Sequence, residues 1–148
     1  MFLRGGSTGT ATVIRGDGVF LRPPTMADHP AWAALREESR SFLLPWEPAW
    51  PPDELSKAAF RRRLKRYHRE MQEDTGYPFL VFRSSDNVLM GGLSLAYVRR
   101  GVTQTCSLGY WMGERFAGRG YMTAAVRATL PYVFGTLRLH RLEAACLP

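Results

Sequence analysis

The sequence predicts one α/β (α+β) domain, in which a mixed β-sheet carries helices on both faces. Three observations lead to this prediction. Strand-like and helix-like segments follow one another in the order β-α-α-β-β-β-α-β. At 148 residues the chain can bury one hydrophobic core and is too short for two. Hydrophobic residues make up 45% of the chain and aromatic residues 12%, which is typical of a folded globular domain.

A strand and a helix are expected first. Residues 13–21 have the composition of a strand, and two prolines then turn the chain. Thr25 and Asp28 have the spacing of a capping box, which predicts the start of a helix that runs to about residue 39. Residues 41–52 hold four prolines and two tryptophans. We expect an ordered loop there, because flexible linkers rarely carry tryptophan.

The second helix is predicted over residues 57–74. Its apolar side chains recur at i, i+4, i+7 and i+11, which gives the helix one apolar face, while Lys and Arg cover the rest. Two strands follow at residues 77–83 and 88–98. The segment Ser-Ser-Asp-Asn between them is typical of a hairpin turn.

The C-terminal part reads as strand, helix and strand. Residues 106–112 are apolar and aromatic enough for a buried strand. Apolar residues then recur at helical spacing from Met122 to about residue 135, although Pro131 should kink this helix or end it early. Residues 139–146 predict the last strand.

The loop between the 106–112 strand and the next helix predicts an anion site. The first N–H groups of a helix have no partner inside it, and Gly118 and Gly120 let a phosphate approach the backbone closely. Arg115 and Arg119 add charge and a planar fork that suits phosphate oxygens. A strand-to-helix turn that merely needs glycine is the alternative for the loop taken alone.

With its flanks, this loop resembles a known motif. Residues 109–126, Gly-Tyr-Trp-Met-Gly-Glu-Arg-Phe-Ala-Gly-Arg-Gly-Tyr-Met-Thr-Ala-Ala-Val, resemble the acetyl-CoA motif of the GNAT N-acetyltransferase superfamily. More narrowly, they resemble the ribosomal-protein-alanine acetyltransferase branch, the RimJ/RimL type. Residues 18–28, 41–48 and 137–144 are similar to three further stretches of that branch. The resemblance covers about residues 13–148.

The resemblance implies a GNAT-like, mostly antiparallel sheet and direct transfer of acetyl from acetyl-CoA, a co-substrate, to an amine. The thioester would lie along the strand before the loop, where a main-chain N–H would serve the oxyanion, and the pyrophosphate would lie on the loop. Ala117 and Met122 depart from the broad superfamily pattern. These departures are tolerated, because the pyrophosphate would bind mainly to main-chain N–H groups, which every non-proline residue supplies. The implied cofactor-binding residues are Tyr110, Trp111, Met112, Ala117, Gly118, Arg119, Gly120, Tyr121 and Met122.

Two carboxylates are candidates for accepting the proton of the amine. Glu47 lies between Trp46 and Trp50 in the sequence, and burial in a cleft would raise its pKa toward the working range. An ordinary loop acid is the alternative. Glu143 on the last strand is the second candidate, or a structural ion-pair partner. His140, at the start of that strand, is more consistent with packing or a surface role.

The implied acceptor is the N-terminal alanine amine of a ribosomal protein or a similar peptide, with a small amine as an alternative. Members of this branch usually continue past residue 148 into a helix and two more strands. We therefore expect a single GNAT-like domain over residues 13–148 that is incomplete at its C-terminus. Its open strand edge would favour a homodimer. A catalytically defective CoA-binding module is the alternative function.

Charge and composition limit the partners and the cellular location that we expect for this chain. The net charge is +7, and the basic helix is explained by a solvated face, or by attraction of an acidic partner, ribosomal RNA or the CoA phosphates. No nucleic-acid-reading motif occurs, so specific nucleic-acid recognition is not expected. Residues 1–12 are expected to be a mobile N-terminus without a signal region, which indicates a cytoplasmic protein without membrane contact. Cys106 and Cys146 are expected to be buried free thiols, and no metal set is visible.

Overall fold

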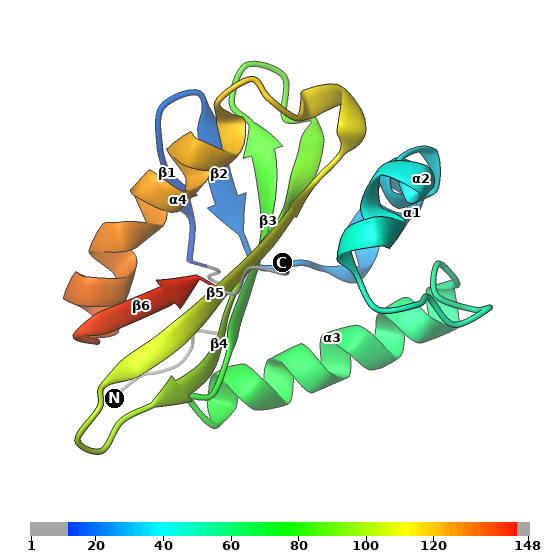
Figure 1. The fold of residues 1–148 in the computed structure, drawn as a ribbon. Helices are drawn as coiled ribbons and strands as arrows, with labels where there is room; N and C mark the ends of the chain where they lie inside the picture. The colour runs from blue at the N-terminus through cyan, green and yellow to red at the C-terminus, as the bar shows by residue number, and fades with distance from the viewer. Residues whose placement is uncertain (1–11, 145–148) are drawn as a thin grey trace.

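The computed structural model describes residues 12–144 and contains one six-stranded sheet (Figure 1). The strands lie in sequence order: β1 (Ile14–Arg15), β2 (Val19–Arg22), β3 (Tyr77–Arg83), β4 (Leu89–Arg99), β5 (Thr105–Met112) and β6 (Arg141–Ala144). Neighbours from β1 to β5 are antiparallel, whereas β6 is parallel to β5. The predicted mixed and mostly antiparallel sheet is confirmed.

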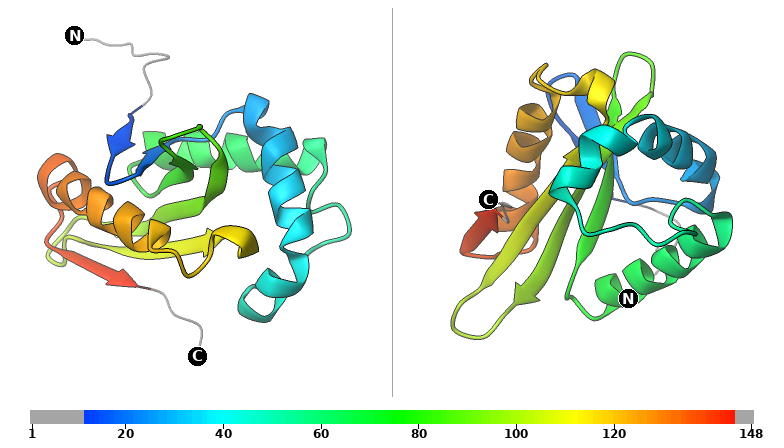
Figure 2. Two further views of the ribbon diagram at one scale, coloured as in Figure 1. Left: turned by 90° about the horizontal axis from the view of Figure 1, so that it is seen from above. Right: turned by 45° about the vertical axis from the view of Figure 1, so that its right-hand side comes forward.

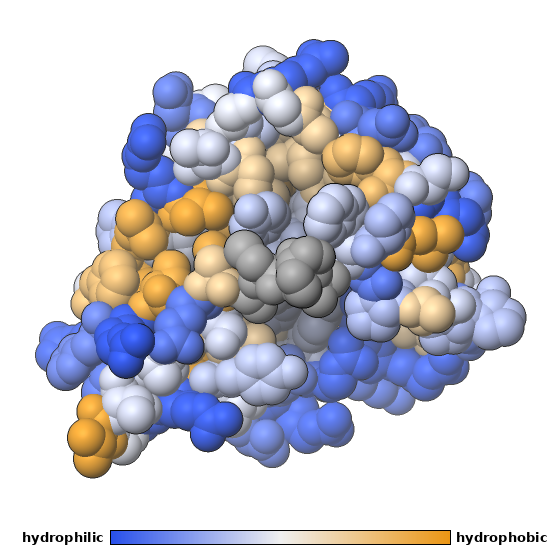
Figure 3. Space-filling model, viewed as in Figure 1, coloured by the Kyte–Doolittle hydropathy of each residue, from blue (hydrophilic) through white to orange (hydrophobic). Residues whose placement is uncertain are grey.

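Helices cover both faces of the sheet, as predicted (Figure 2). The helices are α1 (His29–Glu38), α2 (Arg40–Leu43), α3 (Lys57–Gln72) and α4 (Tyr121–Pro131). α4 packs on one face, and α1 and α3 lie on the other. The side chains of β5 point alternately to the two faces of the sheet: Leu108 and Tyr110 face α4, whereas Trp111 faces α1 and α3. Apolar side chains gather over α4 and β6, on the left of Figure 3.

The predicted single strand over residues 13–21 is wrong in one respect, because the chain turns back on itself within it. Gly16 donates a backbone hydrogen bond to Val19 at 2.9 Å and closes a tight turn between β1 and β2. Gly18 has a φ of +75°, which glycine adopts without strain. The Gly-Asp-Gly turn therefore overrides the strand composition of its flanks.

The proline-rich segment is a loop only in its second half. Its first half forms α2 and a 3₁₀ turn over Leu44–Trp46, and Leu43 is buried against the domain. Proline at the second position of such a turn costs nothing, because that N–H has no partner within the turn.

The remaining elements follow the predictions closely. α3, β3, β4 and β5 lie within two residues of their expected bounds. The prediction that Pro131 ends its helix early is confirmed, since α4 stops there and a π-helical turn, Tyr132–Thr136, follows. The Cys106 thiol is free, and burial raises its pKa, which favours the inert thiol. Cys146 and most of residues 1–12 lie outside the described residues. None of the described helices could cross a bilayer.

The predicted capping box is present and gives a stability prediction. The Asp28 carboxylate accepts hydrogen bonds from the Thr25 N–H at 2.7 Å and from both terminal nitrogens of Arg22. Burial alone would raise the pKa of Asp28, but the bonds from Arg22 and Thr25 together lower it below its ordinary value. The stabilisation is therefore complete above about pH 4 and is lost as the pH falls through the lowered value.

We expect Asp28→Asn to lower the free energy of unfolding at pH 7 by about 1–3 kcal/mol, because it leaves Arg22 without its anion. Urea denaturation at pH 7 and pH 3 measures this. The difference between the variant and the wild type should shrink at the lower pH. An equal difference at both values would show that the charge of Asp28 contributes nothing.

Candidate active site

The second half of β5 has an open edge. β6 pairs with β5 only from Thr105 to Leu108, and within residues 12–144 no other strand pairs with that side of residues 109–112. The Gly113 N–H donates to the Met90 carbonyl of β4 at 2.8 Å. Because backbone groups alternate in direction along an antiparallel pair, the N–H groups of Tyr110 and Met112 point away from β4, toward this open edge. The edge is a row of unused main-chain donors and acceptors.

The glycine loop continues directly from this edge. Gly118 and Gly120 have φ values of +73° and +84°, and Gly120 caps α4 in the left-handed conformation. The first bond of the helix runs from the Ala124 N–H to the Gly120 carbonyl at 3.0 Å. The N–H groups of the three residues between them therefore have no partner within the helix and point to its N-terminal end. This geometry fits a bound anion such as a pyrophosphate.

The two arginines of the loop differ in their surroundings. Arg115 pairs with Glu38 at 3.0 Å, so its charge is partly balanced. Arg119 has no carboxylate within 4 Å among the described residues, and it lies between the two glycines of positive φ. Both observations leave the Arg119 guanidinium available to a ligand.

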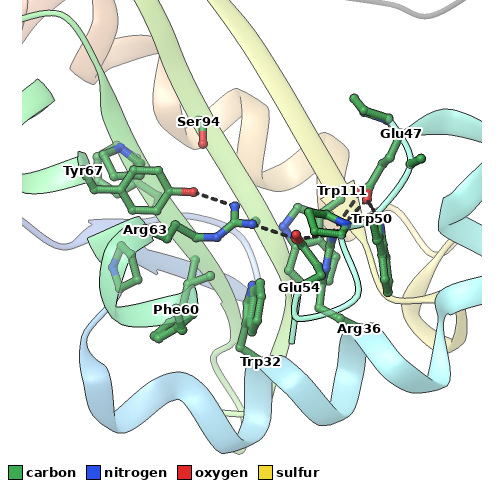
Figure 4. A pocket seen from close by; sticks show the side chains of 18 residues that line it. Trp32, Arg36, Glu47, Trp50, Glu54, Phe60, Arg63, Tyr67, Ser94 and Trp111 are labelled. Atoms are coloured by element: carbon green, nitrogen blue, oxygen red, sulfur yellow. Dashed lines mark hydrogen bonds and ion pairs between the residues drawn. The ribbon is translucent and has the colours of Figure 1, made fainter. Parts of the chain in front are cut away.

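A cleft of about 430 Å³ lies on the other face of the sheet, between α1, α3 and the proline-rich loop (Figure 4). Trp111 of β5 forms part of its wall. Trp111 is therefore the point where the cleft meets the open edge, since its neighbours Tyr110 and Met112 present their N–H groups there. The other lining residues include Trp32, Arg36, Glu47, Trp50, Glu54, Phe60, Arg63, Tyr67 and Ser94.

Arg36 organises one side of the cleft. Its side chain is 7% exposed, and its guanidinium makes two hydrogen bonds to Glu47, at 2.8 and 3.0 Å. The guanidinium carbon lies 4.7 Å from the ring centroid of Trp50 and 4.8 Å from that of Trp111. Arg36 thereby holds the proline-rich loop against β5.

A second ion pair stands next to the first. Arg63 donates to Glu54 at 2.7 Å and to the Tyr67 hydroxyl at 3.2 Å, and Glu54 lies 3.8 Å from Arg36. Burial alone would lower the pKa of Arg63, but Tyr67 and Glu54 raise it above its ordinary value. Two arginines and two glutamates thus form one network, and the cleft carries no net charge.

The two candidate proton acceptors are in different places. Glu47 lies in the cleft, with its side chain 21% exposed, and accepts bonds from Arg36 and from the Trp50 indole at 2.8 Å. Trp46 does not flank it, because that residue is 57% exposed and lies outside the cleft lining. Glu143 does not line the cleft; its side chain is 54% exposed and pairs with Arg141 at 3.0 Å.

Sequence reasoning missed the arginine–glutamate network around Glu47. The spacing predicts one apolar face, which includes Phe60 and Tyr67, and a basic outer face, yet Arg63 lies three residues after Phe60 and shares its side of the helix. That spacing was a usable signal for Arg63. Arg36 and Glu54 gave no comparable signal, since neither stands in a recognisable pattern.

The shape of the cleft depends on Gly92, and this gives a second prediction. A Cβ at this position would lie 2.4 Å from the Trp111 indole nitrogen. We expect Gly92→Ala to push the indole from its place and to weaken acceptor binding by about tenfold while the fold persists. Steady-state kinetics with varied acceptor concentration measures this. Gly109→Ala on the neighbouring strand, where a Cβ would meet nothing within 4 Å, is the matched control. An unchanged KM in the Gly92 variant would contradict the prediction.

Comparison with known proteins identifies relatives with the same architecture. The family model described as "Acetyltransferase (GNAT) domain" matches residues 19–148. The chain is 32% identical over 136 residues to the probable N-acetyltransferase YjcK of Bacillus subtilis, covering 92% of this chain and 75% of that protein. It is 29% identical over 123 residues to the [ribosomal protein uS5]-alanine N-acetyltransferase of Escherichia coli, covering 82% of this chain and 63% of that one.

Solved structures agree with the sequence comparison. Mycobacterium smegmatis RimJ, in complex with CoA-disulfide, superposes with a TM-score of 0.82 at 28% identity, over 93% of this chain and 68% of that one. The ribosomal-protein-S5-alanine acetyltransferase of Vibrio fischeri superposes with a TM-score of 0.83 at 23% identity, which shows the shared fold. The chain thus spans between 63% and 75% of the length of the relatives described here.

Proposed function

The chain belongs to the GNAT acetyltransferase family of N-acetyltransferases, and on this premise we propose that it transfers acetyl from acetyl-CoA to the amine of a peptide N-terminus. The N-terminal alanine of a ribosomal protein is the acceptor proposed first, by analogy with the Escherichia coli relative. The observation that carries the proposal is the meeting of the glycine loop, the open edge of β5 and the cleft at Trp111.

In this proposal, each part of the site has one task in binding acetyl-CoA. The N–H groups at the start of α4, together with Gly118, Arg119 and Gly120, hold the pyrophosphate. The main chain of β5 from Tyr110 to Met112 holds the pantetheine and the thioester. Ala117 leads into the loop and contributes backbone only, as do Tyr121 and Met122.

The chemical step needs a free amine and a stabilised oxyanion. The amine nitrogen attacks the thioester carbon, and the carbonyl oxygen takes up the negative charge of a tetrahedral intermediate. An N–H of Tyr110 or Met112 stabilises that oxygen. The carbon–sulfur bond then breaks, the amide forms, CoA leaves as a thiolate that takes up a proton, and the nitrogen loses its proton to a base or to water.

Glu47 is the proposed proton acceptor. It lies in the cleft next to Trp50, and its carboxylate has one lone-pair position left beyond the three donors that already contact it. Glu143 is the alternative, less favoured because its side chain is more exposed and pairs with Arg141. The charges that line the cleft, two arginines and two glutamates, sum to zero. This balance supports a single amine on an otherwise neutral terminal residue, in preference to a polycationic small amine.

Amine-dependent release of thiol from acetyl-CoA tests the function directly. We expect release with peptides that begin with alanine or serine, and at least tenfold less with peptides that begin with lysine or aspartate and with free small amines. CoA binding without release from any acceptor would instead support the alternative, a CoA-binding module without catalysis. Release of thiol with small amines and not with peptides would show that the acceptor is a small amine.

A further inference from the structure

The excess positive charge of the chain is concentrated on one helix. α3 carries seven Lys and Arg residues against one acid, Glu70, so that it holds +6 of the net charge of +7. The rest of the chain is therefore close to neutral. A charge that served only solubility would be spread over several elements. Hydrophilic side chains accordingly dominate the lower edge of the molecule, where α3 runs (Figure 3).

The two sides of α3 have different surroundings. Phe60 is buried, and Arg63 and Tyr67 line the cleft. The other side is open to solvent. Its exposed cations are Lys57, Arg61, Arg62, Lys65, Arg66 and Arg69. The cleft and this basic side are thus separated by the thickness of one helix, about 10 Å.

Most of these exposed charges are not neutralised. Arg62 pairs with Asp53 at 2.9 Å, and Arg66 reaches Glu70 at 3.7 Å. Within residues 12–144, no carboxylate lies within 4 Å of the other four, which we call the basic face. The basic face consists of Lys57, Arg61, Lys65 and Arg69. Three of its members border a shallow groove with His68, Met26 and Leu64.

We propose that the basic face docks the phosphate backbone of double-stranded RNA. Arg61, Lys65 and Arg69 recur every four residues, so their charges form a row with steps of about 6 Å. Guanidinium and ammonium groups are the side chains that contact phosphates in nucleic-acid complexes. His68 is the one ring that lines the groove, and no Phe, Tyr or Trp stands there, so successive unpaired bases have no series of rings on which to stack. Contacts of this kind recognise duplex shape and charge without reading sequence.

The choice of RNA among polyanions rests on the proposed function. Ribosomal proteins bind RNA, so an enzyme that acetylates one in its RNA-bound form acts beside RNA. A duplex on the outer side of α3 would hold that acceptor near the cleft on the inner side and raise its local concentration.

Fluorescence anisotropy with a labelled RNA duplex of about 20 base pairs tests the proposal, at salt concentrations from about 50 to 200 mM. The variant Arg61→Gln/Lys65→Gln/Arg69→Gln removes the row of charges. The matched control, Arg15→Gln/Arg99→Gln/Arg138→Gln, removes three exposed cations from other elements. We expect the row variant to bind at least about tenfold more weakly, and its salt slope to be shallower by about two to three. The control should stay within about twofold of the wild type in the same assay.

Acetylation of a free peptide is measured in parallel and should be unchanged in the row variant. RNA binding that depends on the row without any peptide acetylation would support the basic face and refute the proposed function. Equal RNA affinity in the row variant and the control would overturn the proposal. Tighter binding of duplex DNA, of single-stranded RNA, of polyglutamate or of vesicles with phosphatidylserine would overturn the assignment to duplex RNA.

Discussion

Replacing Gly120 by glutamate is expected to abolish measurable CoA binding while the fold survives. The carboxylate would stand at the N-terminal end of α4, where the free N–H groups would otherwise receive the pyrophosphate. Placing like charges side by side costs several kcal/mol, so the affinity for CoA should fall at least about 100-fold. Isothermal titration calorimetry with CoA measures the loss, and circular dichroism checks the fold.

Two further variants separate the possible causes of that loss. Gly120 has a φ of +84°, so any other side chain strains the turn. Gly120→Asn tests the strain without the charge, since asparagine tolerates this conformation better than most residues, and it should retain most of the affinity. Gly101→Glu adds the same charge at the turn between β4 and β5, at the other end of the strand, where a Cβ meets nothing within 4 Å. Unchanged CoA affinity in Gly120→Glu would show that the glycine loop is only structural.

The glycine loop could be predicted from the sequence because its function depends on backbone. Positive φ at Gly118 and Gly120, and free N–H groups at the start of α4, follow from the order strand, glycines, helix within a short segment. The open edge of β5 did not follow in this way. It depends on where β6 stops pairing, at Ala144, more than 30 residues further along the chain.

The cleft shows the opposite case, in which sequence reasoning found a residue but not its environment. The tryptophan neighbours of Glu47 predict an apolar setting, which is only half right, because Trp50 contacts Glu47 but Trp46 does not flank it. The main partner of Glu47 is Arg36, which lies 11 residues earlier, on α1. Arg36 in turn stacks on Trp111 of the sheet. Contacts between elements far apart in the sequence leave no periodic pattern, so a single sequence does not reveal them.

The catalytic assignment of Glu47 leads to the second large effect. We expect Glu47→Gln to lower kcat by about 10²–10⁴-fold, with CoA affinity nearly intact, because the amide cannot accept the proton of the amine. Glu47 also holds Arg36, and glutamine replaces one acceptor oxygen of that pair by a donor. A lower kcat alone would therefore not separate proton transfer from a loosened loop.

Glu54→Gln is the control that separates these two effects. Glu54 lines the same cleft and also pairs with an arginine, at 2.7 Å from Arg63, but it has no assigned part in proton transfer. If loosening of the network dominates, both variants lose similar activity. If Glu47 accepts the proton, Glu47→Gln loses far more activity than Glu54→Gln. In that case the pH–rate profile of Glu47→Gln no longer shows the ionisation of an acid, whereas the profile of Glu54→Gln still does. Full recovery of Glu47→Gln at high pH would favour a solvent-mediated role. Wild-type activity would move the assignment to Glu143 or to bulk water, because in either case the amine loses its proton without Glu47.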